Sequence, residues 1–417
     1  MPIVTQVQII VILLTTTLAV ALVAGRLRLP YTLFLVLVGL GLGFIHVLPT
    51  LRLEPDAVLY LFLPALLFEG AWSIETDILA REWFPVFLLA VPGLLVALGL
   101  LAVVLHLGLG VPWALALLLG AIVSPTDPIA VIALLRQLGL PERLRTLVEG
   151  ESLFNDGVGA AAFTVILSFV IGHPINGGRD IALIIISTLW QLVGGPLLGA
   201  GLGFIAARLL RRVDDHLIET TVTFCVAYGV FVIGDAVHTS GLLAVVCAGL
   251  MMGSYGRRIG LTPESSAAAD HVWEFAGYVA NSLLFLVLGI QLGAADFLAE
   301  LPAILWATFG VFAGRAVIIY AGIPLVNALA SRFAVLRATA VPPVWRPLLL
   351  LSGLRGALSL ALVLSLPADV PQLRLLRYTV YGVVLITLVG QGMGMRLLLP
   401  YLRSRLEEAP TPALADR

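Results

Sequence analysis

The sequence predicts an all-α integral membrane protein, and three observations lead to this fold class. The 417 residues carry 24 arginines, no lysine and 25 acidic residues, about half the charge density of an ordinary soluble domain. Sixty per cent of the residues are apolar and the mean hydropathy is +1.06, a level reached when helices face lipid as well as a protein core. The apolar residues are grouped in stretches of roughly 20, the length of one helical crossing of a bilayer.

The chain divides into about thirteen apolar segments that we expect to cross the membrane. We place them at about 6–24, 31–47, 55–72, 84–108, 112–136, 144–171, 181–207, 217–236, 240–256, 271–292, 301–330, 346–366 and 375–400. The first segment lacks the charged start and the small-residue cleavage site of a signal peptide, so we expect it to be retained. We assign residues 1–401 to one transmembrane domain and residues 402–417 to a short cytoplasmic tail.

Arginine placement predicts the orientation of these segments, because Lys and Arg are retained in short loops on the cytoplasmic side. If the N-terminus lies outside, most loop arginines and those near the C-terminus fall inside. The arginines left outside are Arg52, Arg179, Arg374 and Arg377. We therefore expect a multi-pass protein of the cell (plasma or inner) membrane, with its N-terminus outside and its C-terminus in the cytoplasm.

Two of the predicted helices are interrupted. The fifth contains the run SPTDP at 124–128, whose prolines each remove a backbone donor and disfavour helix in the preceding residue. The twelfth contains the run SGLRG at 352–356, whose glycines loosen the helix. Paired interruptions in the two halves of a chain indicate a transport site near the bilayer midplane, in a transporter built from inverted repeats. Asp127 and Arg355 lie in these breaks, where they can balance the partial charges of helix ends.

Ionisable residues inside the predicted helices are candidates for function, because a charge at a helix centre costs at least about 2.5–3.5 kcal/mol. These residues are Glu69, Asp127, Glu151, Asp156, Arg315 and Arg355. The acids outnumber the arginines, so protons or bound cations must neutralise the surplus negative charge.

The densest polar cluster is the run ESLFND in the sixth segment. On a helix, Ser152 and Asp156 share one stripe, and Glu151 and Asn155 share the neighbouring one. Oxygen ligands from Asp156, Ser152 and Thr126 suit a hard, singly charged cation such as Na⁺ or Li⁺. A transition metal is not expected, because no His or Cys lies nearby. The structural alternatives are a hydroxyl bonded back to its own helix for Ser152 and Thr126, and a hydrogen-bonded structural acid for Asp156.

Several runs together resemble the monovalent cation:proton antiporter-1 family, the sodium/proton exchangers of prokaryotes and eukaryotes. They are SPTDPIAV from Ser124, ESLFNDG from Glu151 and GLRGA from Gly353, joined by LPALLFEG from Leu63 and SGLLAVV from Ser240. The large cytoplasmic regulatory tail of animal and plant members is not expected here, so control by such a domain is not carried over.

The resemblance implies a fold of about 13 helices, arranged as two inverted repeats with crossed broken helices. It implies an ion-carrying core formed by helices within about 84–171 and 301–400. The remaining helices would form a scaffold and the interface of a homodimer.

The resemblance also implies a role for the candidate residues. Asp156 matches the carrier carboxylate, Thr126, Ser152 and Glu69 match positions near the ion, and Asn155 matches a residue that orders the site. A bound Na⁺ would accordingly contact Asp156, Ser152 and Thr126.

Two structural charge pairs are also implied, Glu151 with Arg315 and Asp127 with Arg355. An arginine such as Arg315 can instead extend to the membrane interface. Glu69, close to a helix end, can instead be a solvated residue at the rim.

Competition at one carboxylate predicts the activity. A proton and a cation exclude each other at Asp156, and if the core crosses the membrane only when this charge is neutralised, exchange is obligatory. Because Asn155, rather than a second aspartate, lies beside Asp156, we expect one proton per cation and no net charge transfer. The chain is thus expected to be an electroneutral secondary active antiporter of Na⁺ (or Li⁺) and H⁺, working by alternating access. It is expected not to be an enzyme and to need no cofactor.

Other functions stay open. A K⁺/H⁺ exchanger of the same architecture and a cation channel are alternatives, because oxygen ligands do not fix the size of the cation. An intramembrane aspartyl protease is disfavoured, because Asp235 stands alone near a helix end. A nucleic-acid partner is excluded by the net charge of −1 and by the lack of a basic cluster with interleaved aromatics.

Overall fold

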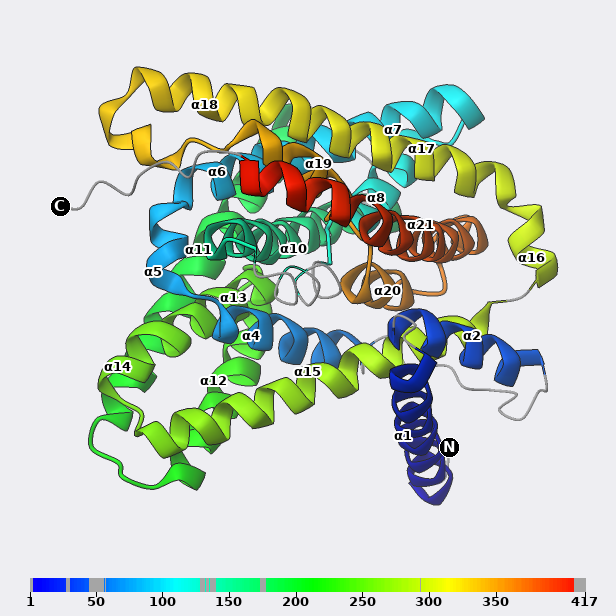
Figure 1. The fold of residues 1–417 in the computed structure, drawn as a ribbon. Helices are drawn as coiled ribbons and strands as arrows, with labels where there is room; N and C mark the ends of the chain where they lie inside the picture. The colour runs from blue at the N-terminus through cyan, green and yellow to red at the C-terminus, as the bar shows by residue number, and fades with distance from the viewer. Residues whose placement is uncertain are drawn as a thin grey trace.

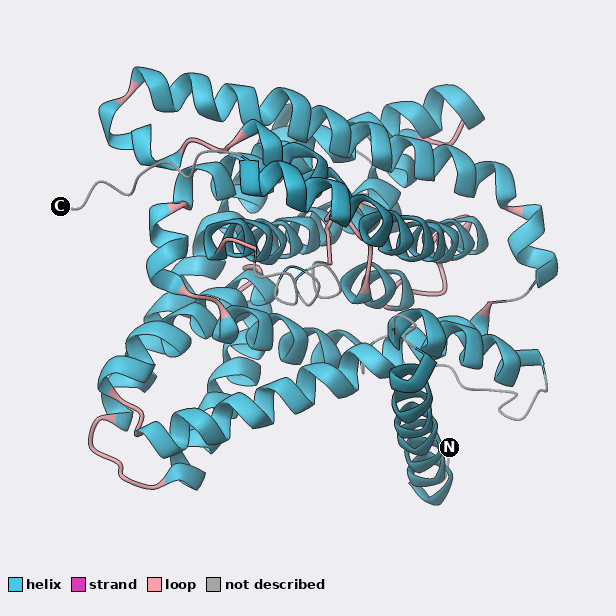
Figure 2. Cartoon of the chain, in the orientation of Figure 1, coloured by secondary structure: helices cyan, strands magenta, loops and turns pink. Residues whose placement is uncertain are grey.

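The computed structural model describes residues 3–27, 31–44, 56, 58–127, 132, 135, 140–172, 178–292 and 294–408. Within these ranges the regular structure is helical and contains no strand (Figures 1 and 2). Eight helices are long and apolar enough to cross a membrane, and four shorter apolar helices accompany them in the described part of the chain. The all-α fold class is confirmed, and the number of thirteen crossings stays a prediction.

The helices follow one another along the chain with short connections. Those before the first break are α1 (Ile3–Leu27), α2 (Tyr31–Phe44), α4 (Leu63–Ser73), α5 (Thr76–Arg81), α6 (Trp83–Leu88), α7 (Leu94–Leu109) and α8 (Trp113–Val123). The middle helices are α10 (Glu142–Ile171), α11 (Gly178–Leu210), α12 (His216–Ala236), α13 (Gly241–Met251), α14 (Arg257–Ile259) and α15 (Pro263–Gln291). The last are α16 (Ala294–Ala299), α17 (Leu301–Val317), α18 (Ile323–Arg332), α19 (Arg346–Leu351), α20 (Ala357–Leu364) and α21 (Leu373–Glu408).

Short π-helical and 3₁₀ stretches complete the described structure. The π-helical stretches are Val58–Phe62 before α4, Leu89–Gly93 between α6 and α7, Met252–Gly256 after α13, and Ile318–Gly322 between α17 and α18. The 3₁₀ stretches are Ala334–Thr339 and Pro343–Trp345, in the connection before α19.

Most helix ends agree with the predicted segments to within a few residues, and two helices extend further. α15 begins at Pro263 rather than near 271, because the Thr262 hydroxyl accepts a hydrogen bond from the backbone nitrogen of Ser265 (3.2 Å) and proline is favoured in the first helical turn. α21 continues to Glu408, so the predicted tail starts as helix. The remainder of that tail lies outside the described residues.

The helices that surround α10 come from both ends of the sequence. In Figure 1, α17 and α18 run along the upper edge, α4 and α15 lie below, and α10, α20 and α21 lie between them. α7 contacts α17, and α8 contacts α10, α20 and α21. The helices of the predicted core ranges therefore lie next to one another, and α10 also contacts α4 and α13 on its other side.

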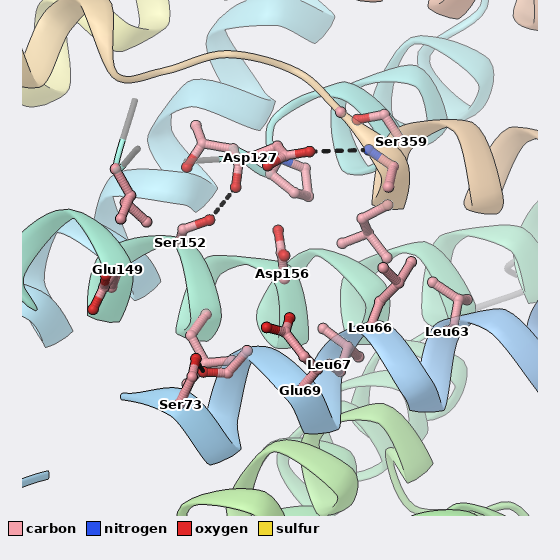
Figure 3. A pocket seen from close by; sticks show the side chains of 18 of the residues that line it. Leu63, Leu66, Leu67, Glu69, Ser73, Asp127, Glu149, Ser152, Asp156 and Ser359 are labelled. Carbon is pink, nitrogen blue, oxygen red and sulfur yellow. Dashed lines mark hydrogen bonds between the residues drawn. The ribbon is translucent and has the colours of Figure 1, made fainter. Parts of the chain in front are cut away.

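The two interruptions lie against each other. The backbone nitrogen of Asp127, in the first break, donates to the carbonyl oxygen of Leu354 in the second (2.8 Å). The backbone nitrogen of Ala357 donates to the Asp127 carboxylate (3.3 Å; Figure 3). A Cβ at Gly356 would overlap this carboxylate, so only glycine allows the approach.

Charged side chains stand at the ends of the broken helices, where partial charges of opposite sign are exposed. The Asp127 carboxylate lies at the positive N-terminus of α20, while the second half of its own broken helix lies outside the described residues. The negative C-terminus of α19 is bound by Arg315, which donates from Nη2 to the Leu349 carbonyl (2.7 Å). Arg355 donates to the Gly353 carbonyl within its own break (3.1 Å).

Arg315 also joins α17 to α10. Its guanidinium makes a two-pronged ion pair with Glu151, with Nη2–Oε2 at 3.0 Å and a shorter contact between Nη1 and Oε1. Both residues are 2% exposed, so the arginine does not extend to an interface.

α10 passes close to the first break. A Cβ at Gly159 would overlap the ring of Pro125, which places this face of α10 directly against the interrupted chain. This contact fixes both the distance and the rotation of α10 relative to the break.

We expect Arg315→Met to destabilise the protein strongly. The substitution leaves the buried Glu151 carboxylate without its cation, a loss of about 3–5 kcal/mol for a broken buried pair, and the Leu349 carbonyl keeps only the Ser352 hydroxyl as a side-chain donor. The free energy of unfolding of the purified protein in detergent measures this loss. The matched control is Arg258→Met, which removes the exposed ion pair with Asp77 and should cost less than about 1 kcal/mol. Equal losses in the two variants would contradict the buried pair's structural importance.

Candidate functional site

A cavity of about 430 Å³ opens beside the middle of α10 (Figure 3). Its walls come from α4, the first break, α10, α20 and one residue of α15. Carboxylates lie along it, and among the described residues no arginine does; the acids are Glu69, Asp127, Glu149, Asp156 and Glu274. The cavity therefore concentrates negative charge and favours cations.

The two polar stripes of α10 face different surroundings. Ser152 and Asp156 line the cavity. Glu151 and Asn155 line a separate space of about 10 Å³, together with the two buried arginines of the core. The one-residue offset along the helix thus separates the side chains beside the cavity from those that lie beside the two buried arginines.

Side chains of α10 complete the hydrogen bonding of the first break. The amide of Asn155 donates to the Thr126 hydroxyl (2.8 Å) and accepts from the Thr126 backbone nitrogen (3.2 Å). The Ser152 hydroxyl donates to the Thr126 carbonyl rather than to its own helix. All three residues are buried. Thr126 is therefore held in one conformation beside Asp156.

Asp156 lies near the middle of the 30-residue α10, and its carboxylate faces the cavity (Figure 3). No hydrogen bond joins it to another described residue. Asp127 and Arg355 act on it electrostatically. A carboxylate in this position is available to a proton or to a cation.

Glu69 belongs to α4 and faces Asp156 across the cavity in Figure 3. Its carboxylate also lies beside Gly277 of α15, where a Cβ would stand 3.2 Å from Oε2. Glu69 is half-buried and lines both this cavity and a larger outer one. The structure therefore places Glu69 where the two cavities adjoin.

The outer cavity has a volume of about 640 Å³ and shares Glu69, Ser73 and Glu274 with the first. Arg257 and Arg258 line its far part. The two cavities therefore adjoin at these three residues.

Sequence reasoning missed several residues of the cavity, among them Glu149, Glu274 and Ser359. Glu149 had a readable signal, because it precedes Ser152 by three residues and Asp156 by seven and so belongs to their stripe. Glu274 and Ser359 reach the cavity through the packing of α15 and α20, which no local pattern indicates.

The donor set suits an alkali cation. Among the described residues, no group of three or more His, Cys, Asp and Glu side chains is placed to hold a metal ion. The oxygens that line the cavity belong to carboxylates and hydroxyls, which are hard ligands.

Comparison with known proteins agrees with this geometry. The Na(+)/H(+) antiporter ApNhaP of Aphanothece halophytica is 36% identical over 376 residues, which cover 89% of this chain and 69% of that protein. The Na(+)/H(+) antiporter NhaP of Pseudomonas aeruginosa is 32% identical over 343 residues, covering 80% of this chain and 78% of that protein.

A solved structure shares the fold. The sodium proton antiporter MjNhaP1 from Methanocaldococcus jannaschii superposes with a TM-score of 0.78 at 19% identity, over 97% of this chain and 99% of that one. The family model for the transmembrane region of sodium/hydrogen exchangers matches residues 10–400. This chain is therefore a multi-pass membrane protein of the sodium/hydrogen exchanger family, as the runs in the two breaks and in α10 predict.

Proposed function

We propose that this chain is a secondary active antiporter that exchanges Na⁺ (or Li⁺) for H⁺ by alternating access, with the two ions competing at Asp156. The observation that carries the proposal is the Asp156 carboxylate, which faces a cavity lined by acids and hydroxyls and, among the described residues, by no arginine. The names of the two bacterial relatives as Na⁺/H⁺ antiporters support the choice of ions.

The ion site consists of Asp156, Ser152 and Thr126, with Glu69 on the opposite wall. Asn155 positions Thr126 through its two hydrogen bonds. A cation bound there takes the place of the proton, because each neutralises the same carboxylate. Binding of one ion therefore releases the other.

Exchange is obligatory if the empty site cannot cross the membrane. An uncompensated carboxylate inside the bilayer costs several kcal/mol, so the core moves only when Asp156 carries a proton or a cation. Two other charges of the core have fixed counterparts: Glu151 binds Arg315, and Asp127 lies at the N-terminus of α20. Only the charge on Asp156 changes during transport, which gives one proton per cation.

The orientation and assembly form part of the proposal. The outer cavity opens between residues 72–77 and Arg257–Arg258, segments that the arginine distribution places in the cytoplasm. The structure then corresponds to the inward-open state, with the N-terminus outside. In the cell membrane, the helices outside the core ranges would form the scaffold and the contact between two copies.

Asp156→Asn should abolish exchange while the protein still folds. The amide keeps the shape of the side chain but binds neither an exchangeable proton nor the charge of a cation. Dissipation of an imposed proton gradient in everted vesicles, on addition of Na⁺, Li⁺ and K⁺ in turn, measures the loss. Asp235→Asn is the control, because this carboxylate lies at the exposed end of α12 and accepts from Tyr60 (2.9 Å). Cation-dependent proton flux retained in Asp156→Asn would refute the carrier assignment, and a response of the wild type to K⁺ alone would refute the choice of cation.

Competition also predicts how pH affects the apparent affinity for Na⁺. In the range where Asp156 is mostly protonated, each unit decrease in pH should raise the half-saturating Na⁺ concentration about tenfold, because one proton must leave for each cation bound. Rates measured against Na⁺ concentration at several pH values in proteoliposomes test this. A half-saturating concentration independent of pH, with only the maximal rate changing, would show that the two ions bind at different groups.

The stoichiometry can be tested separately. An exchange of one proton for one cation moves no net charge, so a membrane potential set by valinomycin and a K⁺ gradient should leave the rate of exchange unchanged. A rate that follows the sign of the potential would require more than one proton per cation.

A further inference from the structure

Ser359 is a residue of the cavity with no role in the site described above. It lies in the first turn of α20 and is 1% exposed. It lines the same cavity as Asp156, on the wall opposite Glu69 (Figure 3). Its hydroxyl oxygen has no hydrogen-bond partner among the described residues.

Three other buried serines near the breaks are paired. Ser152 donates to the Thr126 carbonyl. Ser352 and Ser365 donate to carbonyls of their own helical segments, each at 2.9 Å. Ser359 therefore differs from its neighbours in having a free hydroxyl beside the cavity.

The hydroxyl of Ser359 lies directly after the second break. A serine in a helix ordinarily donates to the carbonyl three or four residues earlier, which for Ser359 belongs to Gly356 or Arg355. Both precede the first residue of α20, and Gly356 has a non-helical backbone (φ −144°, ψ −142°). The Gly356 carbonyl accepts from the backbone nitrogen of Leu360 (3.3 Å), and the Ser359 hydroxyl bonds to neither carbonyl.

A buried hydroxyl without a partner is costly, so it should have one when the cavity is filled. The cavity beside it is large enough for a cation with part of its water shell. A hard alkali cation binds neutral oxygens such as hydroxyls and carbonyls. The Ser359 hydroxyl is an oxygen of this kind.

We propose that Ser359 supplies a further oxygen ligand to the transported cation. This inference rests on the proposed exchange function. Asp156, Ser152 and Thr126 bring ligands from α10 and the first break, and Ser359 adds one from the helix that follows the second break. Both broken helices then contact the ion, and the added ligand contributes to selectivity among alkali cations. Protonation of Asp156 does not need Ser359.

The test uses Ser359→Ala and Ser359→Thr, with Ser365→Ala as the matched control. Ser365 is a buried serine at the end of the same helix whose hydroxyl is already paired. In proteoliposomes at fixed pH, Ser359→Ala should raise the half-saturating Na⁺ concentration about five-fold, the effect of losing one neutral polar contact. The maximal rate should stay close to that of the wild type. Ser359→Thr, which keeps the hydroxyl, and Ser365→Ala should both resemble the wild type.

The expected rise in the half-saturating concentration should depend on which cation is transported. The half-saturating concentrations of Li⁺ and Na⁺ should rise by different factors in Ser359→Ala, because the two ions differ in size and so in their need for the added ligand. If Ser359→Ala matches Ser365→Ala for both cations, the ligand role is overturned while the exchange function stands. If the wild type shows no cation-dependent proton flux, the exchange function itself fails.

Labelling gives a readout that does not depend on transport. Ser359→Cys, in a background with Cys225 and Cys247 replaced by alanine, should react with a water-soluble methanethiosulfonate reagent through the cavity. Na⁺ should slow this reaction and an equal concentration of choline should not. Equal rates in Na⁺ and choline, or a thiol that does not react at all, would overturn the proposal.

Discussion

The structure depends on one constraint: backbone groups that leave a helix inside a membrane must find partners within the protein. The chain meets it by placing its two breaks against each other and closing them with side chains. Asp127 bonds to backbone within the second break, at Leu354, and directly after it, at Ala357. Asn155 satisfies Thr126. The side chains that stabilise the interruptions therefore lie beside Asp156, at the proposed ion site.

The same arrangement separates fixed charge from exchangeable charge. Glu151 and Arg315 neutralise each other where water does not reach. Asp156, five residues further along α10, faces a cavity open to one side of the molecule. A transporter that exchanges one charge for another needs its remaining charges to stay constant while the core moves. The separation of the Glu151–Arg315 pair from Asp156 meets this need.

Sequence reasoning located the helices, both breaks and the stripes of α10, because each rests on local patterns: apolar length, proline and glycine, and helical periodicity. It predicted the fold class from the same local patterns. It did not show that Arg315 binds the end of α19, or that Glu274 and Ser359 reach the cavity, because these contacts join segments far apart in the chain. Sequence reasoning also missed the start of α15 at Pro263. That start could have been predicted, because the capping residue Thr262 is present in the sequence.

The contact between Gly159 and Pro125 limits how the sequence of α10 can change in evolution. Because the stripes of α10 are one residue apart, inserting a single residue upstream of them would turn the helix by roughly 100° and bring the arginine-binding face toward the ion route. Close packing against the proline opposes such a rotation. Preference for a different alkali ion can therefore be acquired by substitutions on the cavity face alone, while the opposite face keeps the charge balance on which folding depends.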